Sequence, residues 1–569
     1  MKNRLIVTIL NTIADILELQ EVKFKPQAYR KAALSIEELS EDVEEVYKRG
    51  ELGELPGVGE SIAEKIEEII KTGKLNYYEQ LKKKIDIDVE ALNEVYGLGP
   101  KKIKILYTKL GVRNLRDLEK VLVKHKVRDL EGFGVKTEEL LWRGLRFVQG
   151  NPKRFLYYHA QPVVEKLLSE LRQLRVVSKA EIAGSFRRGK ETVGDLDILV
   201  VSNEPSTVMG KFVQFSDVKE VIAKGLSKSS VRLENGLQVD LRVVKEREFG
   251  SALLYFIGNK EHNVELRTLA LSKGYTLNEY GLFTLKDKKW VAGRSEEDIH
   301  TKLGLQFIPA ELRENHGEIK EALHKNLPKL VEFKDFKGAF HNHSLWSDGQ
   351  NTLLEMASCA ENLGWKFISF NDHFGSMGIT NPLNERRLQG YLKEIEKVRK
   401  KVGIRVFSGV EIDIAKDGKL PLAKVKLKEL DVVVASVHTA MTMPEELMTK
   451  RVCTAVEQEG VTILGHPTGR LLNEREPIQV NLSAVLETAR ERGVFLEINS
   501  SGKRLDLNGE FTKAGKDFGC MFALSTDAHE VRGLKHYDLG MMMARRGWLE
   551  KKDLVNCWDI KKMENLLKR

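Results

Sequence analysis

Three aspartates on two apolar segments constrain the middle of this 569-residue chain most strongly. Asp195 and Asp197 lie two positions apart in GDLDILV, so in a strand both side chains point to the same face. Asp240, in LQVDLRVV, can join them there from a neighbouring strand. Three carboxylates on one face form an oxygen-only site of the kind that Mg²⁺ prefers, and paired ions serve displacement at phosphorus. The pattern therefore predicts a metal-dependent phosphoryl-transfer site on a sheet.

The residues just upstream of the aspartate pair are suited to binding phosphate. Gly184 and Ser185 form a turn that offers backbone N–H groups and a hydroxyl, and Arg187 and Arg188 add positive charge. A lone Asp-x-Asp is weak evidence for a metal site, and a solvated charge run on a surface strand is the alternative interpretation. The turn, the arginine pair and the second strand together favour the metal site.

This order of residues resembles the nucleotidyltransferase palm of the family X DNA polymerases, the group of DNA polymerase beta. The resemblance implies that Asp195 and Asp197 bind two ions, Mg²⁺ or Mn²⁺, and that Asp240 helps to deprotonate the primer 3′-hydroxyl. It also implies that Ser185 and Arg188 hold the triphosphate of the incoming nucleotide.

A second segment, LLYFIGNKEHNVELR (253–267), resembles the Tyr-Phe-x-Gly segment of the same family, which lies beside the nucleotide sugar. The resemblance implies that Tyr255, Phe256 and Gly258 sense the ribose 2′ position. Asn263 and Arg267 would then lie near the base and the template.

A repeated pattern of an apolar residue, Gly-x-Gly and a helix fills the N-terminal third, at 54–66, 95–112 and 130–145. The glycines allow close approach of the backbone, and the helix start offers free N–H groups, so each repeat can hold a DNA phosphate. One such turn is ordinarily just a helix start, whereas three with adjacent lysines resemble the helix-hairpin-helix motif of DNA repair proteins. The predicted DNA-binding residues are Gly57, Gly59, Gly97, Gly99, Lys101 and Lys102.

Residues 1–80 also resemble the small N-terminal lyase domain of polymerase beta. The resemblance implies that Lys65 is the Schiff-base lysine of a lyase and that Lys25 helps to bind a 5′-phosphate. A lyase amine must be partly neutral, which requires burial or neighbouring cations. Because Glu64 adjoins Lys65, a solvated lysine that touches the DNA backbone is the favoured alternative.

From residue 340 onwards, short apolar strands alternate with amphipathic helices, which predicts βα units and a barrel-like α/β domain. Metal-ligand residue types recur at the strand ends, and such ends converge on one face of a barrel. Imidazole mixed with carboxylate suits Zn²⁺, Mn²⁺ or Fe. The predicted ligands are His341, His343, Asp348, His373, Glu411, His438, His466, Asp527 and His529.

This ligand set resembles the PHP (polymerase and histidinol phosphatase) domain, whose members bind up to three metals with nine residues. All nine positions are filled here, so the resemblance implies an active hydrolase that cleaves at phosphorus. Arg470, just after His466, is a candidate for steadying the substrate phosphate.

These patterns together predict a multidomain protein of the α+β and α/β classes, with helical N-terminal domains that carry helix-hairpin-helix motifs, a nucleotidyltransferase palm and a C-terminal PHP-type distorted α/β barrel. The predicted divisions are a lyase-like DNA-binding domain (1–80), a helix-hairpin-helix region (81–148), the palm (149–250), a nucleotide-side subdomain (251–315), a linker (316–337) and the PHP metallo-phosphoesterase (338–569).

Composition narrows the setting in which the chain works. No run of 18 or more apolar residues occurs, so no membrane span is expected. The four cysteines lie far apart, which excludes a Cys-x-x-Cys zinc ribbon and argues against a disulfide scaffold. We therefore expect a cytoplasmic, nucleoid-associated protein. The net charge of +9 permits a polyanionic partner but would not predict one by itself.

The resemblance covers nearly the whole chain and is to bacterial and archaeal family X polymerases with a C-terminal PHP domain. It implies a monomeric, template-directed polymerase that uses dNTPs to fill short gaps in gapped or nicked double-stranded DNA during base excision repair. The PHP domain would act as a 3′–5′ exonuclease, a 3′-phosphatase or an abasic-site endonuclease. Two alternatives stay open: a DNA repair nuclease or phosphatase with a weak polymerase site, and a scaffold that binds gapped DNA without catalysis.

Overall fold

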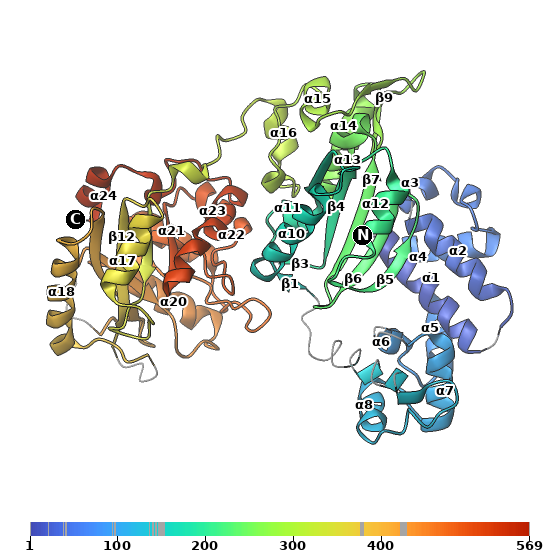
Figure 1. The fold of residues 1–569 in the computed structure, drawn as a ribbon, viewed down its shortest axis with the longest axis horizontal. Helices are drawn as coiled ribbons and strands as arrows, with labels where there is room; N and C mark the ends of the chain where they lie inside the picture. The colour runs from blue at the N-terminus through green and yellow to red at the C-terminus, as the bar shows by residue number, and fades with distance from the viewer. Residues whose placement is uncertain are drawn as a thin grey trace. The chain divides into compact units, whose positions relative to one another are not determined.

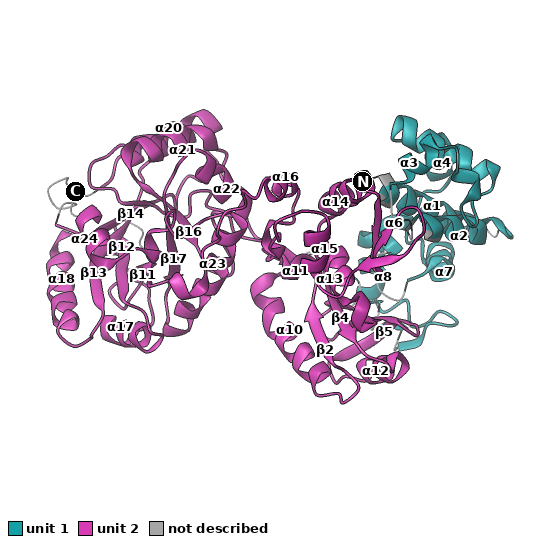
Figure 2. Cartoon of the chain, turned by 90° about the horizontal axis from the view of Figure 1, so that it is seen from above, with its two compact units in different colours: residues 1–153 teal, residues 154–569 magenta. Residues whose placement is uncertain are grey.

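The computed structural model describes residues 2–20, 22–37, 39, 42–93, 95, 98–135, 137–138, 141–142, 145, 154–375, 380–421 and 429–567. The chain divides into two compact units, residues 1–153 and 154–569 (Figure 2). Within the described ranges, no helix combines the length and apolar character needed to cross a membrane. The finer division into six segments stays a prediction.

The first unit is helical among its described residues. Apolar side chains recur every three or four positions on α1 (Lys2–Leu19), where Ile6, Leu10 and Ile13 are fully buried against α2 and α7. The other elements are α2 (Lys25–Glu37), α3 (Val43–Lys48), η1 (Leu52–Glu54), α4 (Glu60–Thr72), α5 (Asn76–Lys84), α6 (Val89–Asn93), α7 (Pro100–Leu110) and α8 (Leu115–Val123).

The second unit begins with a five-stranded sheet in the order β2-β4-β7-β6-β5. Its central strands β4 and β7 run parallel, and the apolar residues of β4 are buried because the sheet is covered by helices. The elements are β1 (Phe155–Leu156), α10 (Tyr157–Arg172), β2 (Lys179–Ile182), α11 (Gly184–Arg187), β3 (Thr192–Val193), β4 (Asp195–Val201), α12 (Pro205–Phe212), β5 (Val218–Lys224), β6 (Lys228–Leu233) and β7 (Gln238–Val244).

A smaller subdomain follows the sheet and contains a three-stranded antiparallel sheet in the order β10-β9-β8. Its first helix, α13, contacts β4 of the larger sheet. The elements are η2 (Glu246–Glu248), α13 (Phe249–Ile257), α14 (Lys260–Ser272), β8 (Tyr275–Asn278), β9 (Gly281–Thr284), β10 (Trp290–Ala292), α15 (Glu296–Lys302), η3 (Ala310–Leu312) and α16 (Glu318–Leu323).

The C-terminal part is a closed barrel of seven parallel strands, ringed by helices (Figure 1). The strands are β11 (Gly338–Asn342), β12 (Phe367–Phe374), β13 (Arg405–Asp413), β14 (Val432–Ser436), β15 (Ile463–Leu464), β16 (Phe495–Asn499) and β17 (Phe522–Ala528). The helices are α17 (Leu353–Asn362), α18 (Glu385–Arg399), α20 (Glu445–Val456), α21 (Leu482–Arg492), α22 (Gly509–Asp517), α23 (Tyr537–Arg546) and α24 (Ile560–Leu567), with short 3₁₀ turns at η4 (Phe333–Asp335), η5 (Val531–His536) and η6 (Val555–Cys557).

The barrel interior is apolar and packed at one end and polar at the other, and residues an even number of positions apart on a strand contribute to both ends. Phe367 and Phe407 are buried together with ring centroids 5.6 Å apart. His373 lies six positions after Phe367 on β12, and Glu411 lies four positions after Phe407 on β13, so each pair faces the same side of its strand. The barrel interior is therefore apolar at the start of its strands and polar at their carboxyl ends.

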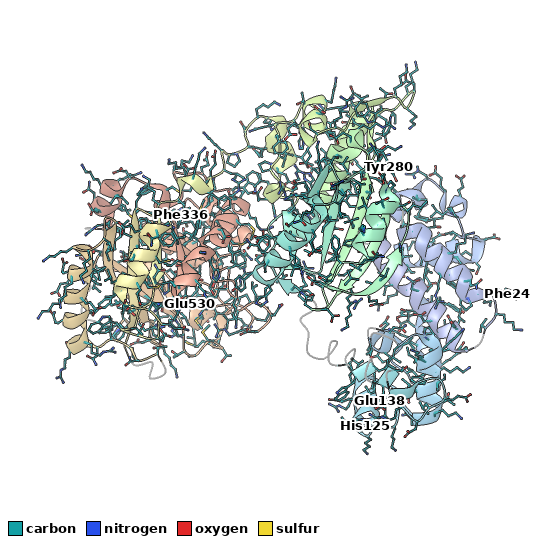
Figure 3. The ribbon with its side chains drawn as sticks, in the orientation of Figure 1. Phe24, His125, Glu138, Tyr280, Phe336 and Glu530 are labelled. Carbon is teal, nitrogen blue, oxygen red and sulfur yellow. The ribbon has the colours of Figure 1, made fainter. Side chains whose placement is uncertain are left out.

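Aromatic stacking attaches the segment before β11 to the barrel. Phe336, labelled in Figure 3, stacks on Tyr537 at the start of α23 with centroids 4.6 Å apart and meets Trp365 edge-on at 5.4 Å. Such offset and edge-on contacts stabilise by about 0.5–1.5 kcal/mol beyond the burial of their area. This contact fixes the end of the linker against α23.

Candidate active sites

The three predicted carboxylates meet on the five-stranded sheet. Asp197 on β4 is the register partner of Asp240 on the parallel strand β7, and Asp195 lies two positions earlier on the same face. Burial, followed by the charges of Asp195 and Asp240, raises the pKa of Asp197 to about 7. The pKa of Asp195 is raised as well, by burial and by Asp240. Three like charges held this close create a site that bound cations would stabilise, and oxygen ligands alone fit Mg²⁺ or Mn²⁺.

Partners of these carboxylates were missed in the sequence. Lys228 Nζ lies 3.3 Å from Asp240 Oδ2, and Gln238 Nε2 donates to Asp240 Oδ1 at 3.0 Å. Arg242 lies two positions after Asp240 on β7, with its guanidinium 4.6 Å from the ring centroid of Phe256. A spacing of two from a known site aspartate is the signal that could have identified both Gln238 and Arg242.

The turn before β4 must begin with glycine. Gly184 has φ +63°, and a Cβ there would lie 2.3 Å from Asp197 Oδ2. The turn is also fixed to β4, because Ala183 N donates to Asp197 O at 2.7 Å. Ser185 follows in the short helix α11, one position after the glycine that lies against Asp197, and its contact with a triphosphate stays a prediction.

Arg188 is instead paired inside the protein. Its Nε lies 2.8 Å from Glu314 Oε1, and its Nη1 donates to Ile257 O. Arg546 of α23 donates to Arg188 O at 2.9 Å and lies 3.4 Å from the same glutamate. Although burial would raise it, the pKa of Glu314 falls to about 2 because of Arg188, Arg546 and Lys190. The predicted contact of Arg188 with a triphosphate stays a prediction.

The nucleotide-side residues gather where α13 passes into α14. Asn263 Nδ2 donates to Tyr255 O at 2.7 Å and to Gly258 O at 3.2 Å, and Arg267 Nε donates to Asn263 O at 3.3 Å. A Cβ at Gly258 would lie 2.4 Å from Asn263 Oδ1, so the turn needs glycine. Phe256 packs edge-on against Tyr255 and links this turn to β7 through Arg242.

All nine predicted ligands converge at the mouth of the barrel. Three overlapping groups each bring their ligand atoms within 4.8 Å of one another. They are His343, Asp348, His373 and His529; His341, His343 and Asp527; and His373, Glu411 and His438. Glu411 is central, and His466 Nε2 joins it at 3.1 Å. The other distances to Glu411 are 2.8 Å (His373 Nδ1), 3.2 Å (His438 Nε2), 3.3 Å (His341 Nε2) and 3.8 Å (His343 Nε2).

The charges of this cluster compensate one another. Burial would lower the pKa of His438, but Glu411 and Asp413 outweigh it and raise that pKa to about 9. Glu411 correspondingly has a pKa well below its usual range, despite burial, because of the surrounding histidines. Burial and the neighbouring His529 and His373 lower the pKa of His343 to about 3.

The donor set fits bound metals. Both ring nitrogens of His343, together with His341 Nε2, are buried and make no hydrogen bond of normal geometry among the described residues. His373 Nδ1 is also buried, 2.8 Å from Glu411 Oε2. His341, His466 and Asp527 have positive φ values of 54°, 26° and 49°, which places backbone strain at three ligand positions. Mixed imidazole and carboxylate donors suit Zn²⁺, Mn²⁺ or Fe.

Carboxylates outside the predicted ligand set orient these histidines, and they were not predicted from the sequence. Glu497, fully buried in the middle of β16, accepts from His341 Nδ1 at 2.6 Å and from the backbone N–H of His466. Asp413 accepts from the backbone N–H of His438 at 2.9 Å. Carboxylates that hold the second ring nitrogen fix the tautomer and orientation of a metal-ligating histidine. A glutamate in the otherwise apolar strand FLEIN was the available signal.

Arg470 does not lie where its sequence position suggested. Its Nε donates to Arg504 O at 3.0 Å, its Nη2 donates to Leu505 O, and the same nitrogen lies 3.4 Å from Glu191 Oε1. These contacts occupy the guanidinium with backbone carbonyls and with a residue beside the five-stranded sheet. Arg470 therefore connects two loops through its Nε and Nη2.

The predicted DNA-binding residues of the first unit lie at helix starts. Gly59 and Gly99 are the N-cap residues of α4 and α7, and Lys101 and Lys102 lie in the first turn of α7. Gly57 has φ +83°, in the left-handed region that favours glycine. Lys25 is the first residue of α2. Gly97 lies outside the described residues.

Lys65 is half-buried on α4. Its Nζ donates to Ser61 O at 2.8 Å and Ser61 Oγ at 2.9 Å, and it lies 5.2 Å from the ring centroid of Tyr77. Lyase chemistry at Lys65 stays a prediction.

Elsewhere in the first unit, His125 and Glu138 lie together (Figure 3), with His125 Nδ1 2.9 Å from Glu138 Oε1.

Family models match four separate parts of the chain. They describe a helix-hairpin-helix domain (residues 1–75), a DNA polymerase beta palm (159–246), a DNA polymerase beta thumb (252–314) and a PHP domain (339–501). With the helical first unit and the closed barrel, these matches confirm the predicted fold class. The subdomain after the palm corresponds to the thumb.

Relatives extend the match to the full length. The DNA polymerase/3′-5′ exonuclease PolX of Bacillus subtilis (strain 168) is 34% identical over 573 residues, covering 100% of both chains. Probable phosphatases of Thermoanaerobacter sp. (strain X514) and Caldicellulosiruptor saccharolyticus are 28% and 29% identical, over 40% of this chain and 93% and 92% of their own. The chain belongs to the family X DNA polymerases that carry a C-terminal PHP domain.

Proposed function

We propose that this chain is a template-directed DNA polymerase that uses dNTPs to fill short gaps in gapped or nicked double-stranded DNA during base excision repair. The observation that carries the proposal is the pairing of Asp197 with Asp240 on parallel strands, with Asp195 on the same face. Divalent ions, Mg²⁺ or Mn²⁺, would there neutralise the triphosphate and activate the primer 3′-hydroxyl. We further expect a cytoplasmic, nucleoid-associated monomer.

The residues around the carboxylates divide the remaining work. Gln238 and Lys228 hold Asp240 in a fixed orientation, which suits it to accept the proton of the 3′-hydroxyl. Asn263 holds the carbonyls of Tyr255 and Gly258, which gives the sugar-facing turn a single shape. Positioning of this kind supplies most of the catalysis in phosphoryl transfer.

In the same proposal the PHP barrel removes nucleotides from DNA 3′ ends, as a 3′–5′ exonuclease. Its nine ligands would hold up to three Zn²⁺, Mn²⁺ or Fe ions, which supply a hydroxide near neutral pH. The name of the Bacillus subtilis relative combines a polymerase and a 3′-5′ exonuclease in one chain of the same length, which supports this pairing.

A 3′-phosphatase activity of the barrel is the second candidate. Relatives named probable phosphatases match 40% of this chain over nearly their own full length. A phosphatase would remove a terminal 3′-phosphate but leave a 3′-hydroxyl primer at its original length.

A labelled primer on a duplex with a one-nucleotide gap tests both activities, with and without dNTPs and with Mg²⁺ or Mn²⁺. We expect Asp197→Ala to abolish extension and retain 3′ shortening, and His341→Ala to do the reverse. A parallel primer with a 3′-phosphate separates exonuclease from phosphatase. Extension that survives Asp197→Ala would overturn the polymerase assignment, and shortening that survives His341→Ala would overturn the barrel assignment.

A further inference from the structure

Two loops at the mouth of the barrel hold each other in place. Arg470, in the loop after β15, donates to Arg504 O and Leu505 O in the loop after β16. The backbone N–H of Leu472 donates to Lys503 O at 2.7 Å. The backbone of residue 504 is therefore fixed on both sides by the neighbouring loop.

The side chain of Arg504 lies at the metal-ligand cluster. Its Nε is 3.4 Å from Asp527 Oδ2, and 18% of the side chain is exposed. Arg504 thus contacts one of the nine predicted ligands directly.

One nitrogen of this guanidinium is buried and unused. Arg504 Nη1 has no hydrogen-bond partner among the described residues. The nearby arginines are engaged with backbone carbonyls: Arg470 as described above, and Arg475 through Nε and Nη2, which donate to Gly469 O at 3.0 and 2.7 Å. A buried charged donor without a partner destabilises the folded protein, so a ligand that accepts this hydrogen bond would offset that cost.

We propose that Arg504 binds the phosphate group of the substrate at the barrel site. The inference rests on the proposed phosphoesterase function and names the residue that holds the substrate there. The ligand class is a phosphate ester at a DNA 3′ end, because a planar guanidinium with free N–H groups matches the oxygens of a phosphate. Arg504 takes the role that the sequence suggested for Arg470.

The test compares Arg504→Met with Lys503→Met in the full-length, metal-loaded protein. Lys503 is adjacent and 61% exposed, and pairs with Glu474 on the surface, so both variants lose one positive charge within the same loop. Calorimetry with inorganic phosphate gives the affinity, and metal analysis gives the ions retained per chain. Kinetics on primers ending in a 3′-hydroxyl or a 3′-phosphate give kcat and KM.

We expect Arg504→Met to weaken phosphate binding about 10- to 100-fold, since a hydrogen bond to a charged group is worth about 1.5–3 kcal/mol. KM on the cleaved primer should rise, and Arg504→Lys should restore part of the affinity. Metal content and gap-filling extension should be unchanged, and Lys503→Met should behave as wild type. The primer whose KM rises identifies a diester or a terminal phosphate as the natural ligand.

Wild-type phosphate affinity in Arg504→Met with full metal content would overturn the inference. So would a loss of metal, because Arg504 would then serve to hold Asp527. Another outcome is that the wild-type protein cleaves neither primer but still binds phosphate more tightly than Arg504→Met does. In that case the phosphoesterase function fails while phosphate binding by Arg504 stands.

Discussion

The palm and the barrel of this chain each gather carboxylates, but they balance the charges differently. In the palm, Asp195, Asp197 and Asp240 repel one another, and the pKa of Asp197 rises to about 7. In the barrel, five histidines surround Glu411, whose pKa is well below its usual range. Bound cations would therefore relieve the repulsion in the palm, whereas the barrel offers mixed imidazole and carboxylate donors that already balance one another.

Removing the central barrel carboxylate should give the largest effect. Glu411→Gln leaves the buried histidines without their shared anion, and breaking a buried charge cluster costs about 3–5 kcal/mol. We expect 3′ shortening to fall at least about a hundredfold, with loss of metal on dialysis and normal gap filling. Metal analysis and the primer assay measure this. Retained metal with normal shortening would show that Glu411 is not the shared ligand.

The reciprocal change in the palm should abolish extension and also alter stability. A folded pKa of about 7 at Asp197, above its usual 3.8, means that the metal-free fold loses stability as pH rises from about 4 to 7. Asp197→Asn removes that loss, so at about pH 8 the variant should be more stable than the wild type by up to on the order of 4 kcal/mol. Urea unfolding in EDTA across this pH range measures it, with Asp217→Asn as the surface control. Parallel curves for wild type and Asp197→Asn would contradict the raised pKa.

Competition between protons and Mg²⁺ for Asp197 should make metal binding by the palm depend on pH. Below about pH 7 the proton on Asp197 competes with Mg²⁺, so palm affinity should fall by up to about tenfold per pH unit. The Asp197→Asn variant should lose this dependence together with most of its affinity. Calorimetric Mg²⁺ titration of a Glu411→Gln background isolates the palm, and affinity independent of pH from 5.5 to 7 would refute the explanation.

A smaller effect on 3′ shortening is expected from a change at Glu497, which contacts a predicted ligand but is not one itself. Glu497→Gln keeps the shape of the group that orients His341 but removes its charge. Loss of such a partner typically reduces metal affinity or activity about 10- to 100-fold. Shortening rates at limiting metal measure it, and Glu491→Gln on the barrel surface is the matched control. An effect that excess metal fails to reduce would point to a role other than ligand orientation.

The smallest effect is expected at Lys65. If Lys65 contacts a DNA phosphate, Lys65→Ala should weaken binding of gapped DNA a few-fold. It should also reduce by about one the slope of log affinity against log salt concentration. Borohydride treatment with a 5′-deoxyribose phosphate substrate separates this role from lyase chemistry. A covalent adduct present in wild type and absent from Lys65→Ala would assign the Schiff base, whereas an unchanged salt slope would remove Lys65 from the DNA contacts.

Prediction from sequence succeeded where short local spacing encodes geometry. Asp195 and Asp197 share a face because strand side chains alternate, and the barrel ligands converge because parallel strands end at one mouth. It failed for contacts between distant loops. Arg470 follows His466 by four positions, whereas Arg504 lies 23 positions before Asp527. Only the contact between the two loops shows which guanidinium has a nitrogen without a partner among the described residues.

The sequence by itself predicted the family, through a resemblance that the comparisons confirm, and the side chains that gather in the palm and at the barrel mouth, because each set lies in short motifs at strand ends. Tertiary structure decided which charges meet. Only folding places Arg188 against Glu314 and Arg546, and Glu497 against His341. Electrostatic pairing depends on distances of a few ångströms between residues hundreds of positions apart, which no local pattern records.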